Sequence, residues 1–145
     1  MASGFEDAAS VVDVEKNPSA DEPVHFIQVW VLPDTAGIEP SYEQKDINEE
    51  LATGVLVPIA SGKNHPNAVK IHQRDAVLWG ARLQPGQTVT LPDDGHVHLF
   101  VAVGDGQLAT GDQIGEGAAA RLTQAGVVEF IAGQAGAEIL AWATT

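Results

Sequence analysis

Short apolar runs rich in β-branched residues alternate with turn-forming residues along most of the chain. The longest run, residues 24–32 (VHFIQVWVL), is apolar at nearly every position, which is typical of a strand buried on both faces. Runs spaced roughly 8–12 residues apart, with glycine, proline and aspartate between them, predict a sandwich or barrel and not an alternating β-α sheet. The other expected strands cover residues 55–60, 68–72, 76–83, 87–91, 96–103, 119–123, 127–132 and 138–143.

The rest of the pattern places one short helix and one arm around this sheet. Residues 46–52 (DINEELA) predict a helical turn or two, because acidic residues near a helix start interact favourably with its dipole. Residues 1–22 are polar and turn-rich, so we expect an arm there, followed by a barrel over residues 23–145.

The turns favour a particular kind of barrel. Residues 83–87 (LQPGQ) lead into one strand and residues 94–98 (DGHVH) into the next, and residues 104–106 (GDG) predict its hairpin. Glycine-containing turns in this order are typical of a cupin, in which strands cross between the two sheets of a jelly roll. The fold expected is therefore all-β: a single cupin (double-stranded β-helix) barrel with an N-terminal arm.

Charge and composition limit the classes of ligand and partner that the chain can bind. The chain carries a formal net charge of −13, which repels phosphate groups and disfavours nucleic acid and anionic membranes as ligands. It has no cysteine, so a metal would need His, Asp, Glu or backbone oxygen. No stretch has the length of a membrane span and the acidic N-terminus lacks a signal-peptide pattern, so we expect a cytoplasmic protein.

Consecutive motifs resemble the pirin family. Residues 17–19 (NPS), 22–33 (EPVHFIQVWVLP) and 37–44 (GIEPSYEQ) are similar to its central signature. Downstream, residues 69–75 (VKIHQRD) with Trp79 are similar to the segment that opens the second cupin domain of pirin-like quercetin dioxygenases. The resemblance covers nearly the whole chain and implies the C-terminal half of a two-cupin protein, with residues 1–22 as a remnant of the first half.

The same resemblance implies that the family's metal centre belongs to the other half. Members hold a divalent metal, iron in the best-known cases, with an H-x-H pair and an HSE segment just before NPS. The HSE segment aligns with Asp13-Val14-Glu15, so Glu15 is kept, Asp13 replaces the histidine, and the H-x-H pair has no counterpart. Asp13 and Glu15 would share one face of a strand, but two carboxylates alone make a weak site.

A second candidate is the pair His96 and His98, since H-x-H on a strand is how cupins begin a metal site. Both side chains would point to one face. A working site would also need a later Glu and a further His, but residues 101–104 (VAVG) and 118–121 (AAAR) supply neither. Partly exposed, hydrogen-bonded strand histidines are therefore the favoured interpretation.

Other side chains have structural expectations. His25 and Trp30 lie in the 24–32 run, where burial in the core is expected. His65 falls in a predicted surface loop, where solvent exposure is expected. Trp79 is expected either to line the barrel mouth or to pack in the core.

Three functions remain open from the sequence. The first is a non-catalytic pirin relative, an interaction or assembly module with no cofactor or metal and no catalytic residue. The alternative is a metal-dependent dioxygenase resembling quercetin 2,3-dioxygenase, with iron in a site completed by another subunit. The third is a small-ligand binder that uses the barrel interior. Too few metal ligands are present for the enzyme, so the first hypothesis is favoured.

The resemblance also predicts a homodimer. In two-domain relatives the second barrel packs against the first, so a chain lacking the first should expose the surface that it covers. Large apolar patches on soluble proteins tend to be buried by association. We expect Val11, Val12 and Val14 of the arm to pair across a two-fold dimer. The same surface could bind another protein.

Overall fold

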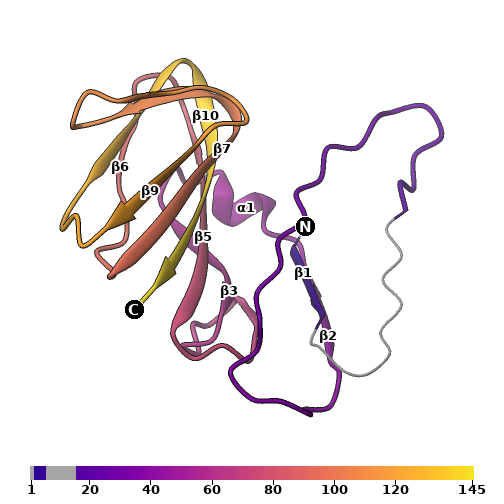
Figure 1. Cartoon of the computed structure of the whole chain (residues 1–145). Coiled ribbons are helices and arrows are strands. Elements are labelled where there is room, and N and C mark those ends of the chain that lie inside the picture. Colours follow the sequence, from indigo (N-terminus) through magenta and orange to yellow (C-terminus); the bar gives the residue numbers. More distant parts are fainter. Residues whose placement is uncertain (1, 6–15) are drawn as a thin grey trace.

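The computed structural model describes residues 2–5 and 16–145, most of which curl into one antiparallel barrel (Figure 1). An eight-stranded sheet runs in the order β4-β3-β5-β10-β7-β8, with β6 paired to β10 and β9 paired to β7. Among the strand pairs that the structure describes, only β3–β4 is parallel. These pairings confirm the all-β prediction. The strands are β3 (Val57–Ser61), β4 (Val69–Lys70), β5 (Ala76–Leu83), β6 (Thr88–Thr90), β7 (His96–Leu108), β8 (Gln113–Ile114), β9 (Ala119–Thr123) and β10 (Glu129–Thr144).

The two longest strands bend where hairpins were expected. The predicted hairpin at residues 104–106 is wrong, because those residues lie inside β7; the runs 127–132 and 138–143 likewise belong to the single strand β10. The β7–β10 register shifts between Ala132 and Ala137. Gly104 has φ +77°, and a Cβ there would lie 2.1 Å from the carbonyl oxygen of Gly136. Glycine thus lets two strands bend and cross closely without ending them.

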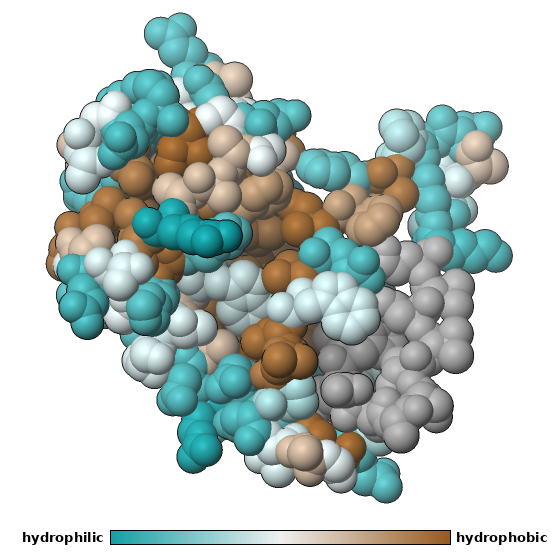
Figure 2. Space-filling view, viewed as in Figure 1, coloured by the Kyte–Doolittle hydropathy of each residue, from teal (hydrophilic) through white to brown (hydrophobic). Residues whose placement is uncertain are grey.

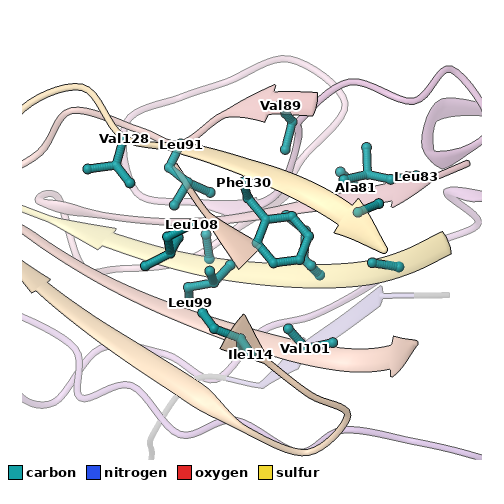
Figure 3. Close-up of a cluster of buried hydrophobic side chains, with 14 of the residues drawn as sticks. Ala81, Leu83, Val89, Leu91, Leu99, Val101, Leu108, Ile114, Val128 and Phe130 are labelled. Atoms are coloured by element: carbon teal, nitrogen blue, oxygen red, sulfur yellow. The ribbon is translucent and has the colours of Figure 1, made fainter. Parts of the chain in front are cut away.

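The barrel interior is filled by apolar side chains from β5, β6, β7 and β10 (Figure 3). Along β7, the buried Val97, Leu99 and Val101 alternate with exposed His96 and His98, as the period of an extended strand requires. Phe130 of β10 is fully buried at the centre of this cluster.

A second, smaller cluster covers the outer face of the sheet. The helix α1 (Asn48–Leu51) confirms the prediction of a short helix and buries Leu51. Leu51 packs with Ile47, Ile59 and Leu78, and Trp142 is partly buried against them. Gly80 leaves room for this contact, since a Cβ there would lie 2.4 Å from Ile59 Cδ1. No helix in the described part of the chain has the length and apolarity needed to cross a membrane.

Residues 24–32, which we name the apolar extension, contradict the prediction of a buried strand. They are extended but form no strand, and the chain from residue 16 to β2 (Tyr42–Lys45) runs outside the barrel (Figure 1). Trp30 is 86% exposed, and His25 is also exposed, so neither is a core residue. The physical reason is that such a run needs a sheet on both sides, and no described strand pairs with it.

One end of the apolar extension is fixed to the barrel. The Asp34 amide donates to the carbonyl oxygen of His72 at 2.8 Å, and Gln73 Nε2 donates to the Leu32 carbonyl oxygen at 3.2 Å. The Asp34 carboxylate accepts from the Arg74 amide at 2.9 Å and lies 3.3 Å from the Arg74 guanidinium. The hydrogen bond from the Arg74 amide, aided by one from Thr35, lowers the pKa of Asp34.

The chain then rejoins the barrel at β2, which pairs antiparallel with β1 (Ala2–Phe5). Lys45 Nζ donates to the Ala68 carbonyl oxygen at 3.0 Å, and Glu43 accepts from the Lys70 amide at 2.7 Å. That amide hydrogen bond lowers the pKa of Glu43. Polar contacts on either side of β4 therefore hold residues 34–43 as a loop with two fixed ends, while the apolar extension is anchored at its Leu32 end.

Removing the central core side chain should destabilise the whole barrel. Phe130→Ala should lower the free energy of unfolding by about 3–5 kcal/mol, because it leaves a cavity that packed neighbours cannot fill. Urea denaturation followed by far-UV circular dichroism measures this. The control is Val127→Ala, at a side chain 69% exposed, which should change stability by less than about 0.5 kcal/mol. Equal small effects would contradict the assignment of Phe130 to the core.

The Asp34 contact should be lost in acid. Because folding lowers the pKa of Asp34 below its ordinary value of 3.8, the contact stabilises the anchor above that pH and weakens as pH falls through the folded pKa. In an NMR titration of the wild type, the Arg74 amide resonance should move as the pH falls below 3.8 and through the folded pKa of Asp34. In Asp34→Asn the same resonance should stay unchanged. Asp21→Asn is the control and should keep the transition. A wild-type Arg74 signal that stays still throughout would contradict the assignment.

Candidate functional site

The predicted histidine pair lies on the outer face of the barrel. His96 and His98 are both exposed on β7, and His98 stands opposite Trp142 on one side and Arg121 on the other. His96 Nδ1 lies 3.4 Å from the hydroxyl of Thr123. Among the described residues no three His, Asp or Glu side chains come together to hold a metal ion. The pair is therefore placed as surface histidines, without a third ligand among the residues that the structure describes.

The other two candidate ligands, Asp13 and Glu15, lie outside the described residues. The arm valines Val11, Val12 and Val14 lie there too. The structure thus gives no position for the segment that aligns with the family's HSE motif.

A polar cluster that the sequence did not predict lies where β3 ends. Ser61 pairs with Val77 of β5, and Trp79 comes two residues later on the same face, packed against the main core. Ser61 is 2% exposed. Its hydroxyl lies 2.8 Å from His65 Nδ1, and the rings of His65 and Trp79 meet edge-on with centroids 5.1 Å apart. We name Ser61, His65 and Trp79 the mouth cluster.

The loop that carries His65 is bent back onto the barrel. Asn64 and Asn67 flank His65 and Pro66 with φ values of 60° and 65°, in the left-handed region that asparagine tolerates better than most residues. The result corrects the expectation of an exposed histidine: His65 is half-buried. No local pattern could have shown this, because the contact with Trp79 depends on the pairing of β3 with β5.

Hydrogen bonding orients the mouth cluster. The Lys63 amide donates to Ser61 Oγ at 3.0 Å, and the direction of the second hydrogen bond, between Ser61 Oγ and His65 Nδ1, is set by the histidine tautomer. Lys63 Nζ also lies 3.6 Å from Asp94, which ties the loop to the segment before β7. Trp79 Nε1 is buried and has no hydrogen-bond partner among the described residues.

An open depression of about 400 Å³ lies on the surface, and no charged side chain contributes to its lining. The barrel centre is packed with the core residues already described. The residues that line the depression are Pro85, Gly86, Ala132, Gly133 and Gln134.

Comparison with known proteins agrees with the pirin resemblance. The family model "Quercetinase C-terminal cupin domain" matches residues 58–142, from β3 to β10, and leaves the apolar extension outside. A Mycobacterium bovis protein, "Putative quercetin 2,3-dioxygenase Mb0187c", is 42% identical over 143 residues, covering 98% of this chain and 58% of that protein. "Quercetin 2,3-dioxygenase" of Escherichia coli K12 is 31% identical over 75 residues, covering 52% of this chain and 31% of that protein. The chain therefore spans no more than 58% of the length of either relative.

Solved structures show the same fold. YhhW from Escherichia coli matches with a TM-score of 0.69 at 19% identity, covering 80% of this chain and 48% of that one. A second structure is titled bacterial pirin YhhW in complex with nickel(II) and matches with a TM-score of 0.67. At this identity the likeness supports the fold alone. Together with the match over residues 58–142, it establishes that this chain belongs to the quercetinase C-terminal cupin family, the C-terminal cupin of pirin-related proteins.

Proposed function

We propose that this chain is a non-catalytic assembly module of the pirin family, which binds a protein partner through its apolar extension. The observation that carries the proposal is the exposure of that segment. Val24, Phe26, Trp30 and Leu32 are 53–86% exposed, whereas Ile27, Val29 and Val31 are 38–43% exposed. This period of two is that of an extended strand with one face turned to solvent and the other partly covered.

A strand-like segment of this kind is suited to pairing with a sheet. Contiguous apolar surface is rare on soluble monomers unless it binds something. An extended peptide can add to a sheet edge, where backbone hydrogen bonds give affinity and alternate side chains enter pockets. Figure 2 shows apolar residues in brown on the chain outside the barrel as well as on the barrel itself. The extension therefore presents both the backbone and the side chains that strand addition uses.

The partner proposed is a second copy of this chain, in a two-fold homodimer. Each copy has a formal charge of −13, which opposes association at long range. The 24–32 segment contains no Asp, Glu, Lys or Arg, so the repulsion does not act at the contact itself. The charge also disfavours nucleic acid and anionic lipid as partners.

The alternative function is a metal-dependent dioxygenase. The names of the relatives and the nickel complex of YhhW favour it. The described residues assemble no set of metal ligands, so such a site would draw donors from outside them: from Asp13 and Glu15, from another subunit or from the family's other cupin half. A metal in this role would polarise or activate a bound oxygen-containing ligand.

Self-association should depend on the apolar extension. Light scattering at micromolar concentration should give about twice the chain mass of 15.2 kDa for the wild type and one chain mass for Trp30→Asp, because a charge there opposes burial. Val127→Asp adds the same charge at another exposed apolar site and should stay dimeric. A monomeric wild type, or a dimer unaffected by Trp30→Asp, would refute the proposal. Deletion of residues 1–16 separates a dimer held by the arm from one held by the extension.

The non-catalytic assignment predicts the metal content of the purified protein. Elemental analysis should find no stoichiometric iron, nickel, copper or zinc, and quercetin should be consumed no faster than in buffer. The deciding result for the dioxygenase is near-equimolar metal together with a saturable rate that a chelator abolishes. Two double variants would show which pair holds such a metal. One combines Asp13→Ala with Glu15→Ala, and the other combines His96→Ala with His98→Ala.

A further inference from the structure

The mouth cluster presents two ring nitrogens, of which one is buried without a hydrogen-bond partner among the described residues. The first is Trp79 Nε1–H, which is buried and unpaired. The second is His65 Nε2: in the tautomer that lets the buried Ser61 hydroxyl donate to Nδ1, the ring proton of a neutral His65 is on Nε2. Burying an N–H without an acceptor is costly, so the arrangement favours a ligand that accepts hydrogen bonds.

The surroundings favour an acceptor that is small and negatively charged. Lys63, in the same loop, brings an ammonium group to this end of the barrel, where only Asp94 pairs with it in the described structure. The Trp79 nitrogen is buried, so a ligand must be small and must enter as the loop over residues 62–67 moves aside. A carboxylate has two oxygens that accept hydrogen bonds and a charge that Lys63 would attract.

We propose that the mouth cluster binds a small carboxylate, which accepts hydrogen bonds from Trp79 Nε1–H and His65 Nε2–H. Ser61 is a positioning residue: it fixes the tautomer and ring orientation of His65 from a site that the ligand does not touch. The proposal is independent of the assembly function, because the mouth cluster belongs to the barrel and the apolar extension lies outside it.

The test follows the indole N–H signals of the full-length chain by NMR. Sodium acetate and sodium benzoate are the probes. Sodium chloride at equal ionic strength is the control. The chain has three tryptophans, and the signal lost in Trp79→Phe identifies the one that matters. That signal should move saturably with either carboxylate and not with chloride. Trp142→Phe should leave its movement unchanged.

Two variants test the assigned roles. His65→Phe should weaken carboxylate binding about tenfold or more, since it removes a donor and keeps a ring. Ser61→Ala should weaken binding several-fold, because it frees His65 to adopt the other tautomer. A Trp79 signal that never moves would mean that the His65 ring alone covers the indole N–H. A shift that chloride reproduces, or one that both variants retain in full, would also overturn the proposal. If a variant fails to fold, the wild-type comparison of carboxylate with chloride decides.

Discussion

The pairing of β7 with β10 is the interaction on which the barrel depends. Every other strand of the barrel except β3 and β4 pairs directly with one of these two: β5 and β6 with β10, and β8 and β9 with β7. At the bend, Gly104 lets the β7 backbone approach the carbonyl oxygen of Gly136 in β10, and the two strands pair on both sides of it. A side chain at Gly104 would meet backbone, which cannot move aside as a flexible side chain can. The core around Phe130 and the outer cluster around Leu51 both rest on this one ladder.

The sequence predicted those parts of the fold that depend on neighbouring residues. It failed where a feature depends on contacts between residues far apart in the chain. The bounds of β5 and β9 match the predicted runs, because turn residues mark both ends of each. The bends in β7 and β10 were read as hairpins, because a glycine pair that ends a strand and one that curves it look alike in sequence. The apolar extension was predicted to be a buried strand, but it forms no strand and is exposed. Its exposure could not be predicted, because burial requires a partner strand and composition says nothing about one.

The same difference between local and long-range contacts explains which parts of the candidate sites could be predicted. The outward position of His96 and His98 follows from alternation with Val97 and Leu99, but the alternation alone does not say which set faces the core. The mouth cluster joins residues from β3, a loop and β5 across a strand pair, and none of its members carries a motif. Its unpaired indole N–H is a property of three-dimensional packing. Sequence reasoning could single out residues within the pirin-like motifs, yet this site lies outside all of them except at Trp79.

The anchor at Asp34 has a consequence for the thermodynamics of pairing. Ordering a free peptide costs about 1–2 kcal/mol of backbone conformational entropy for each residue that is fixed. Here the chain after Leu32 is already immobilised by hydrogen bonds to Gln73, His72 and Arg74. Part of that entropic cost is therefore met within the folded chain, before any partner arrives. A detached peptide with the sequence of residues 24–32 would bear the whole of it, and the intact chain is in this sense a preorganised form of its own binding segment.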